Sequence, residues 1–548
     1  MSRTPLFAAL RRVFRLSKLL ATKKTNTPCI ESLLALEQSR LKRQQNHLPS
    51  TNNIYVSAQN AVYSRRRFLT NTLTLAAGLG VGGLLTQCGT TSGNLSQTQT
   101  RIAIIGGGMA GLSAAYHLKQ AGIHATIYEA TKRAGGRMFS LKDKLGTGLV
   151  TELGGEFIDS SHEDLLSFAK VLQLQLLDIA QNTEQAKLIP NAYYINGQHY
   201  SETELITEFS RVVPRIQSHA ELLPNTIDHQ NKDGKVRAFD LVSLEEYWQK
   251  LGINGWLLEV LNGAYTGEYG LEVGEQSSLN FLTMIDTDTS KGRLEMFGDS
   301  DERFKIVGGN AQIPEKLAQT LNKQMEYEYA LEAISAKGAG YSLAFSNGKE
   351  VYADIVIMTL PFSIARQIKW NIDMPTIKHR AIQQLGYGTN SKLVLGMNER
   401  TWRKQGYTGM LFNRPIHTGW DSSQGQNNDT GTGTYTVFAG GSEGREMNKE
   451  RVSYYKPILE QAFKGFAQQN NDRLELFNWA KYPNALGSYS CYKTGQWTGF
   501  GGVEALPVGN ILFAGEHTST VSPGFMNGAA ESGRVAATNL LRRLSGII

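Results

Sequence analysis

The stretch RIAIIGGGMAG, residues 101–111, decides the fold of this chain. It opens with a short apolar run of the kind that forms a buried strand. Gly106, Gly108 and Gly111 follow at once in the spacing G-x-G-x-x-G and open a helical run. A second predicted strand, residues 125–128, ends at Glu129. Strand, glycine turn, helix and strand in this order predict a βαβ unit and therefore an α/β fold.

Each part of this unit suits the binding of a dinucleotide. The glycines allow a tight turn and a close approach of the backbone to a pyrophosphate, and the helix N-terminus offers amide donors and a positive dipole end. The acid that ends the second strand lies 18 residues past the last glycine, where it can accept hydrogen bonds from ribose hydroxyls. The unit predicts cofactor contacts at Gly106, Gly108, Met109, Ala110, Gly111, Glu129 and Ala130.

Two further glycine segments, RAGGR at 133–137 and ELGGEF at 152–157, identify the cofactor more closely. They resemble the corresponding segments of the flavin-containing amine oxidase family, which includes monoamine oxidases, polyamine oxidases and L-amino acid oxidases. The resemblance implies FAD. It implies that Arg137, next to Gly136, helps to hold the pyrophosphate, and that the second segment passes beside the isoalloxazine ring with Gly154, Gly155, Glu156 and Phe157.

The C-terminal part carries a second match to the same family. ILFAGE, residues 511–516, predicts a strand that delivers an acid, and GFMNGAAESG, residues 524–533, opens the last helix. By resemblance, Glu516 binds the ribityl chain and Leu331 contacts the adenine region. A helix N-terminus at the flavin pyrimidine edge would stabilise the negative charge of reduced flavin. This match adds Gly515, Glu516, Phe525 and Met526 to the expected cofactor contacts.

Three residues are expected at the reacting centre. Lys392 lies in GYGTNSKLVL, residues 386–395, which resembles the monoamine oxidase segment whose lysine holds a water against flavin N5. Tyr489, in GSYSCY, and Phe525 fall at the two walls of the family's aromatic cage, which guides a neutral amine toward the flavin. The structural alternatives are a strand lysine that reaches solvent and two ordinary core aromatics.

Two departures from the family concern the cofactor and the substrate. Ser488 stands where monoamine oxidases carry the cysteine bonded to FAD, and Cys491 is three residues out of register, so we predict noncovalent FAD. Phe157 stands where many L-amino acid oxidases carry an arginine for the substrate carboxylate. Asp159 stands where polyamine oxidases place a carboxylate, which favours a cationic substrate; a helix cap is its structural alternative.

The basic charge of the chain belongs to its first hundred residues. These carry 13 Lys and Arg against two acids, whereas the rest has 43 basic and 47 acidic residues, so the pI of about 9.0 does not argue for nucleic-acid binding. The three cysteines, Cys29, Cys88 and Cys491, are too few and too scattered for a disulfide framework or a zinc site. We therefore expect no metal, and we interpret Cys491 as a small buried apolar residue.

The segment SRRRFL, residues 64–69, precedes a short apolar stretch and resembles a twin-arginine export signal. LTQC at 85–88 resembles a lipoprotein box, although Gln87 replaces the usual small residue, so a lipid anchor at Cys88 and an unlipidated chain stay alternatives. We expect export by the twin-arginine machinery to the periplasm or cell envelope. Residues 64–88 would be the signal, 89–100 a linker, and 1–63 a leader or a stretch upstream of the true start.

The predicted architecture is α/β, with a discontinuous Rossmann-like FAD-binding domain and a second domain of mixed sheet and helices over the substrate. The first would comprise residues 101–160, 291–362 and 483–545, and the second residues 161–290 and 363–482.

The predicted reaction oxidises a C–N bond of an amine to an imine, which water hydrolyses to a carbonyl and ammonia or a smaller amine. A cationic di- or polyamine is the favoured substrate, and oxygen or a quinone would accept the electrons. The first alternative is an L-amino acid oxidase or dehydrogenase for basic amino acids. A carotenoid- or porphyrin-type desaturase is disfavoured by Lys392 and the Tyr489/Phe525 pair. The third alternative is an FAD-stabilised envelope lipoprotein without turnover.

Overall fold

The computed structural model describes residues 100–545 except residues 291 and 430. The predicted export signal, the lipoprotein box and nearly all of the linker lie outside the described residues. Among the described residues, no helix is both long and apolar enough to cross a membrane.

A five-stranded parallel sheet confirms the α/β class predicted from residues 101–129. Its strand order is β20-β13-β1-β2-β9, and every neighbouring pair is parallel. The strands come from distant parts of the chain: β1 (Ile102–Ile105), β2 (Thr126–Glu129), β9 (Met325–Tyr327), β13 (Ile355–Met358) and β20 (Ile511–Phe513).

Strand β1 is apolar throughout because both faces of this sheet are covered. Ile104 belongs to a core cluster with residues of helix α5 (Met109–Gln120), whereas Ile105 belongs to a cluster on the opposite face. Alternation along a strand sends successive side chains to opposite faces, so burial of both faces demands a continuous apolar run. The sequence of β1 meets that demand.

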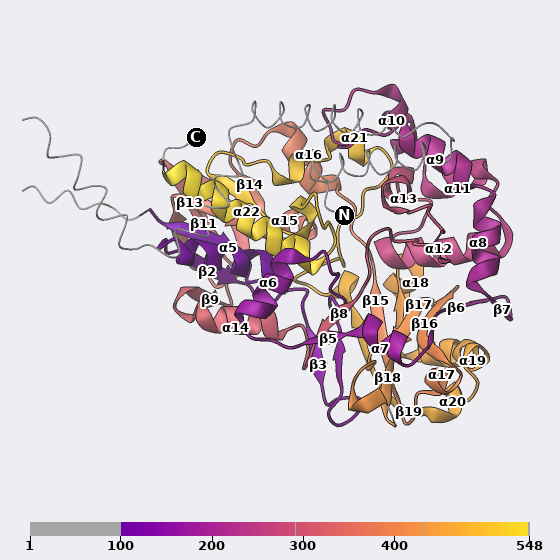
Figure 1. Cartoon of the computed structure of the whole chain (residues 1–548). Helices are drawn as coiled ribbons and strands as arrows, with labels where there is room; N and C mark the ends of the chain where they lie inside the picture. Colours follow the sequence, from indigo (N-terminus) through magenta and orange to yellow (C-terminus); the bar gives the residue numbers. More distant parts are fainter. Residues whose placement is uncertain (1–99, 291, 430, 546–548) are drawn as a thin grey trace, which may run out of the picture. The chain divides into compact units, whose positions relative to one another are not determined.

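Helix α5 lies beside the last helix, α22 (Met526–Leu544), on one face of the parallel sheet (Figure 1). The Ser113 hydroxyl of α5 donates to the Ala530 carbonyl of α22 at 2.6 Å. A Cβ atom at Gly533 would meet the Ala110 carbonyl oxygen at 2.2 Å, so this close approach requires glycine. The contact brings the N-termini of two helices 417 residues apart in the chain to the same end of the sheet.

A four-stranded sheet packs on the other face of the parallel sheet, and its strand order is β12-β11-β10-β14. Leu331 opens its strand β10 (Leu331–Lys337) and is buried in the same cluster as Ile105. The remaining strands are β11 (Gly340–Phe345), β12 (Glu350–Ala353) and β14 (Lys369–Asn371). Helices α15 (Phe362–Ala365) and α16 (Thr376–Gln384) pack in this cluster, whereas α14 (Gln312–Thr320) packs with α5 on the opposite face.

A seven-stranded mixed sheet forms the second large layer, in the order β19-β15-β18-β17-β16-β6-β7. Its pairs are antiparallel except β16 with β6. The strands are β6 (Ile189–Ile195), β7 (Gln198–Tyr200), β15 (Ser391–Met397), β16 (Tyr407–Asn413), β17 (His417–Asp421), β18 (Gly433–Ala439) and β19 (Asn470–Asn478). Every residue of β15 is buried, which places Lys392 inside the protein.

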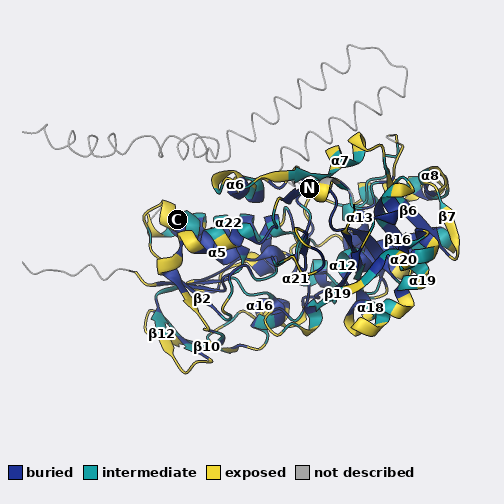
Figure 2. Cartoon of the chain, turned by 90° about the horizontal axis from the view of Figure 1, so that it is seen from below, coloured by how far each residue is buried: buried dark blue, intermediate teal, exposed yellow. Residues whose placement is uncertain are grey.

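A group of helices packs beside this mixed sheet, and α12 (Gly255–Tyr269) contacts β16 and β17 directly. The others are α8 (Glu202–Ser210), α9 (Val213–Glu221), α10 (Gly234–Asp240), α11 (Leu244–Leu251) and α13 (Ser278–Met284). Figure 2 shows buried residues concentrated in the sheets, with exposed residues on outer helices such as α18 (Gly441–Glu446) and α19 (Val452–Ala462).

Candidate functional site

A cavity of about 1450 Å³ collects almost every residue that the sequence singled out. Single small-molecule sites commonly span about 300–1000 Å³, so this cavity has room for a cofactor and a substrate. The predicted residues that line it include Gly106, Gly108, Met109, Ala110, Glu129, Ala130, Gly136, Arg137, Gly154, Gly155, Glu156, Phe157, Asp159, Leu331, Lys392, Tyr489, Gly515, Glu516, Phe525 and Met526. Gly111 is buried just behind them in the first turn of α5.

The glycine turn before α5 has the geometry of an anion site. Gly106 has a φ of 108°, which side chains rarely allow, and Gly108 caps α5 without any side-chain cap. The first-turn amides of a helix have no partner within the helix, so they can donate to a bound anion. A Cβ on Gly136 would come within 3.3 Å of Gly108, which shows how closely the second glycine segment approaches the turn.

Two observations show that the residues present fit FAD. Helix α22 also begins without a side-chain cap, at Phe525, so two uncapped helix N-termini open into one cavity. His517 lines the same cavity, and both of its buried ring nitrogens lack a hydrogen-bond partner among the described residues. Burial lowers the pKa of His517 to about 3, so the ring is neutral. A buried polar atom without a partner calls for an explanation, and in the wall of this cavity a bound dinucleotide, which offers polar partners along its length, would supply one.

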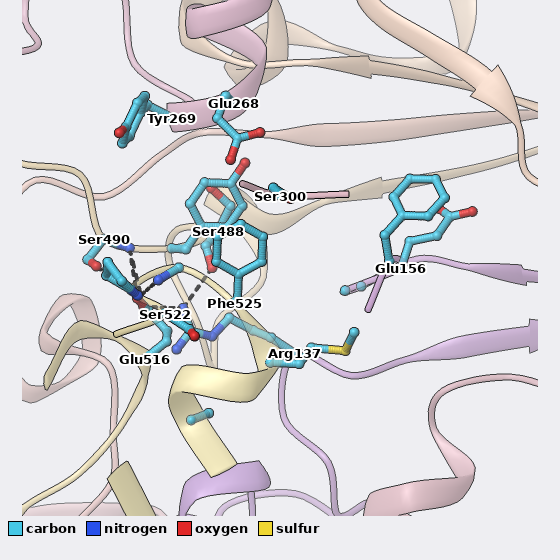
Figure 3. Close-up of a pocket in the computed structure, with 18 of the residues that line it drawn as sticks. Arg137, Glu156, Glu268, Tyr269, Ser300, Ser488, Ser490, Glu516, Ser522 and Phe525 are labelled. Atoms are coloured by element: carbon cyan, nitrogen blue, oxygen red, sulfur yellow. Dashed lines mark hydrogen bonds and ion pairs between the residues drawn. The ribbon is translucent and has the colours of Figure 1, made fainter. Parts of the chain in front are cut away.

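Arg137 ties the second glycine segment to the C-terminal one. Its Nη1 donates to Glu516 Oε1 at 2.8 Å and to the Ser488 carbonyl at 2.7 Å (Figure 3). Burial alone would raise the pKa of Glu516, but Arg137 and hydrogen bonds such as that from the Ser490 hydroxyl hold it below its usual range. Glu516 is therefore a fixed anion in the cavity wall, and Arg137 is the cation that balances it.

Lys392 lies in a buried ion-pair network that its local sequence does not reveal. Its Nζ donates to Glu156 Oε2 at 2.7 Å and to the carbonyls of Glu152 and Gly154, both at 3.0 Å. The other Glu156 oxygen accepts from Lys305 at 2.8 Å, and the two lysine side chains are each 5 % exposed. Lys392 does not reach bulk solvent. Its three N–H donors are already used, which leaves none for the water that the family resemblance implied.

Tyr489 and Phe525 both face the cavity, as the cage prediction requires. The Tyr489 hydroxyl reaches the Gly267 carbonyl of α12 at 3.4 Å. The Phe525 ring lies 5.1 Å from the His162 ring, and His162 in turn contacts the Asp159 carboxylate at 3.3 Å. The two aromatic side chains make no ring contact with each other, so open space can separate them. This arrangement is compatible with a cage for a small amine.

Asp159 is held as a cavity carboxylate and does not cap the helix that follows. Its Oδ1 accepts from the Ser300 hydroxyl and from the Glu302 amide, each at 3.0 Å. Helix α6 (Glu163–Val171) begins after His162 and has no side-chain cap. Burial raises the pKa of Asp159. Phe157, two residues earlier, packs against Trp420 with ring centroids 5.6 Å apart.

Two further carboxylates line this cavity, Glu268 and Glu302, and neither was predicted from the sequence. Burial first, and then the charge of Asp159, raise the pKa of Glu268 to about 7. Burial and the charge of Glu268 raise the pKa of Glu302 to about 8. One signal was present in the sequence: Glu268 lies in the last turn of the mostly apolar helix α12, after a long stretch of buried residues, where a charged residue is unusual. Glu302 has a φ of 43°, which non-glycine residues seldom adopt and which often marks a functional position.

The part of the cavity away from the glycine segments is strongly acidic. Two arginines line it, and each is paired: Arg293 with Glu295 at 2.5 Å, and Arg303 with Asp178 at 2.8 Å. The carboxylates there outnumber them: Asp159, Glu202, Glu204, Asp228, Glu268, Glu295, Asp299, Asp301 and Glu302.

Ser488, in place of a cysteine, faces the cavity and donates from its hydroxyl to Asn390 Oδ1 at 2.5 Å. The free thiol in the described residues, Cys491, is buried, and burial raises its pKa far above the usual range. Cys491 is 1 % exposed, which agrees with its predicted role as a small buried residue.

The chain is similar to known proteins over most of its length. The family profile described as flavin containing amine oxidoreductase matches residues 109–541. A flavin-containing amine oxidase of Oncorhynchus mykiss is 23 % identical over 473 residues, covering 82 % of this chain and 88 % of that protein. The flavin-containing amine oxidase B of Homo sapiens is 23 % identical over 467 residues, covering 81 % and 87 %.

Two solved structures are similar to this fold. Cyclohexylamine oxidase from Brevibacterium oxydans has a TM-score of 0.71 and 20 % identity, and the match covers 82 % of this chain and 100 % of that one. A putrescine oxidase bound to putrescine has a TM-score of 0.68 and 18 % identity, with coverage of 81 % and 99 %.

Proposed function

The chain belongs to the flavin-containing amine oxidoreductase family, and from this premise we propose that it oxidises a C–N bond of a cationic di- or polyamine. Flavin-dependent amine oxidation is the activity of the family. Beyond this activity, we propose a charge for the substrate and a mode of attachment for FAD.

The acidic lining of the cavity is the observation that carries the proposal. Asp159 and Glu268 lie near the aromatic pair, and further carboxylates follow along the cavity. An ammonium that meets such a carboxylate gains a charge-assisted hydrogen bond, worth ~1.5–3 kcal/mol net. A substrate with a second positive charge gains this at a distance from the reacting carbon, whereas a neutral amine or a carboxylate does not.

The chain's own residues provide binding and orientation. The uncapped N-termini of α5 and α22, with Glu129, Arg137, Glu516 and His517, would hold FAD. Bound FAD supplies the capacity to accept two electrons from the C–N bond. Tyr489 and Phe525 orient the amine, and Asp159 anchors the cationic tail. Water then hydrolyses the resulting imine to a carbonyl and ammonia or a smaller amine.

FAD is proposed to be held without a covalent bond. Ser488 carries no thiol, and its hydroxyl is engaged with Asn390 at 2.5 Å. The thiol of Cys491 is 1 % exposed and accepts a contact from the Asn280 amide at 3.5 Å. The absence of a thiol at position 488 and the burial of the Cys491 thiol support this proposal.

Two features disfavour an amino acid oxidase. Phe157 packs on Trp420 and offers no cation for a substrate carboxylate. The arginines of the acidic part, Arg293 and Arg303, already have carboxylate partners. A free carboxylate on the substrate would therefore meet mostly negative charge in this part of the cavity.

Anaerobic titration of the FAD-loaded protein tests the proposal. Putrescine and spermidine should bleach the flavin absorbance faster than leucine or benzylamine at equal concentration. Rapid bleaching by leucine, with none by the diamine, would reverse the assignment in favour of an amino acid oxidase.

We also propose export in folded, FAD-loaded form, on the strength of the residues 64–69 motif. Oxygen or a quinone is the proposed electron acceptor. Replacement of Arg65 and Arg66 by lysine should retain yellow, active protein in the cytoplasm, and unchanged delivery to the envelope would refute the export proposal.

A further inference from the structure

An amine oxidase of this kind must bring its substrate to the reacting position with a free lone pair. Alkylammonium groups resemble lysine, whose pKa is about 10.4, so almost every substrate molecule carries a proton on the reacting nitrogen at neutral pH. An ammonium has no lone pair to donate. A group near the aromatic pair that accepts this proton would let the abundant protonated form of the substrate react, and this inference rests on the proposed function as an amine oxidase.

The Lys392 network does not supply that acceptor. The Lys392 Nζ donates three hydrogen bonds, to Glu156, Glu152 and Gly154, as a charged ammonium does. Each oxygen of Glu156 accepts from a lysine, Lys305 or Lys392. A further proton on Glu156 would break one of these two buried ion pairs, which is costly.

Glu268 has the position and the freedom that the role requires. It lies in the last turn of α12 and lines the cavity. The preceding residue, Gly267, accepts the Tyr489 hydroxyl at 3.4 Å, which places Glu268 beside one wall of the aromatic pair. Figure 3 shows Glu268 and Phe525 projecting into the pocket from opposite sides. No hydrogen bond or ion pair within the described residues engages the Glu268 carboxylate, so it can face a substrate.

The groups around Glu268 hold its pKa near neutral pH. Asp159, Glu302 and Tyr489 line the same cavity, and the charge of Glu268 acts on Glu302, Tyr489 and the buried Tyr265. Burial and the nearby carboxylate raise the pKa of Glu268 to about 7. A base is most effective when its pKa lies near the working pH, because it is then ionised in part and still binds a proton well.

We propose that Glu268 accepts the proton of the substrate's reacting ammonium. The N–H bond breaks, an O–H bond forms on the Glu268 carboxylate, and the electron pair stays on nitrogen as the lone pair of the neutral amine. That amine lies between Tyr489 and Phe525. The proton leaves Glu268 to water at the acidic end of the cavity before the next turnover, which restores the carboxylate.

The test compares Glu268→Gln with the wild-type holoenzyme in anaerobic stopped-flow reduction by putrescine between pH 6 and pH 10. The amide keeps the shape of the side chain but cannot take up the proton. We expect unchanged FAD content, reduction slower by ~10²-fold or more at pH 7, and recovery by about tenfold per pH unit as the neutral amine becomes available. Glu272→Gln is the matched control, because Glu272 accepts from Ser442, does not line the cavity and should show the wild-type profile.

Three other outcomes are informative. A Glu268→Gln profile parallel to the wild type at every pH overturns the proposal. If Glu268→Gln loses FAD, Glu268→Asp is measured in its place. The shorter carboxylate should lower the rate of flavin reduction but keep the wild-type dependence of this rate on pH. A Glu268→Asp rate that recovers only at alkaline pH overturns the proposal. If no amine reduces the wild-type flavin at any pH, the proposed function itself fails, and this result differs from both others.

Discussion

Glu156 bridges two buried lysines: its Oε1 lies 2.8 Å from Lys305 Nζ, and its Oε2 lies 2.7 Å from Lys392 Nζ. The carboxylate is 2 % exposed. Burial alone would raise the pKa of Glu156, but the two ammonium groups lower it below its usual range. The three side chains therefore form one ion-pair unit, of which Glu156 and Lys392 line the cavity.

Removal of the bridging charge should destabilise the protein strongly. Glu156→Gln leaves two buried ammonium groups without their counter-charge, and loss of one partner from a buried pair costs about 3–5 kcal/mol. Urea unfolding of the holoenzyme measures this loss. The control is Glu350→Gln in the exposed Lys337–Glu350 pair, 3.3 Å apart, which should change the unfolding curve very little. Equal effects of the two substitutions would show that the bridge contributes nothing beyond an exposed pair.

Lys392→Met should keep FAD bound and slow the reaction. Methionine roughly preserves the volume of the side chain, and Glu156 retains Lys305 as its partner. The variant loses a positive charge in the wall of the cavity, where reduced flavin develops negative charge. Stopped-flow measurements should show slower reduction, slower reoxidation, or both. Wild-type rates in both half-reactions would assign Lys392 a structural role alone.

The flavin should be released intact when the protein is denatured. Ser488 offers no thiol, and Cys491 is buried away from solvent. After precipitation with acid, all of the yellow colour is expected in the supernatant. Flavin fluorescence that stays with the denatured band on a gel would demonstrate a covalent bond.

The sequence predicted the parts of this protein that depend on local patterns. The strand at 102–105, the glycine turn and the acid at 129 are neighbours in the chain, and each has a short-range physical reason. The Lys305–Glu156 pair joins residues 149 positions apart, and nothing beside Lys305 in the sequence points to its partner. The local sequence could not separate the two interpretations of Asp159, a substrate contact and a helix cap, because its partner Ser300 lies 141 residues away.

Glu302 should make the stability of the protein depend on pH in a predictable direction. Its pKa is about 8 in the folded protein against an ordinary value of 4.5, so between these limits the folded state binds more protons than the unfolded state. Stability from this residue therefore falls as pH rises from about 5 to 8. Glu302→Gln cannot ionise, so its melting temperature should match the wild type near pH 4.5 and exceed it increasingly toward pH 9.

Glu350→Gln provides a control of opposite sign for this pH experiment. Hydrogen bonds from Ser342 and Lys337, with the lysine charge, lower the pKa of Glu350, so its contribution is present above its ordinary pKa and is lost on acidification. This variant should fall slightly below the wild type at high pH. A constant difference between Glu302→Gln and wild type at every pH would contradict the raised pKa of Glu302.

Asp159 should make the KM of the enzyme depend on the charge of the substrate. The carboxylate is held by the Ser300 hydroxyl and the Glu302 amide, each at 3.0 Å, and contacts His162 at 3.3 Å, so it is fixed before substrate arrives. A fixed acceptor needs little reorganisation to bind an ammonium, and the charge-assisted bond is worth ~1.5–3 kcal/mol, or roughly one to two decades in affinity. Asp159→Asn keeps the size of the side chain and can still accept from Ser300, but it removes the charge. We therefore expect KM for putrescine to rise about 10- to 100-fold, while KM for benzylamine, which has no second charge, changes little.

An equal rise for both substrates would mean that Asp159 supports the cavity wall rather than the cationic tail. Fast wild-type turnover of leucine would show that another residue binds a carboxylate, and the amino acid oxidase reading would then replace the diamine one.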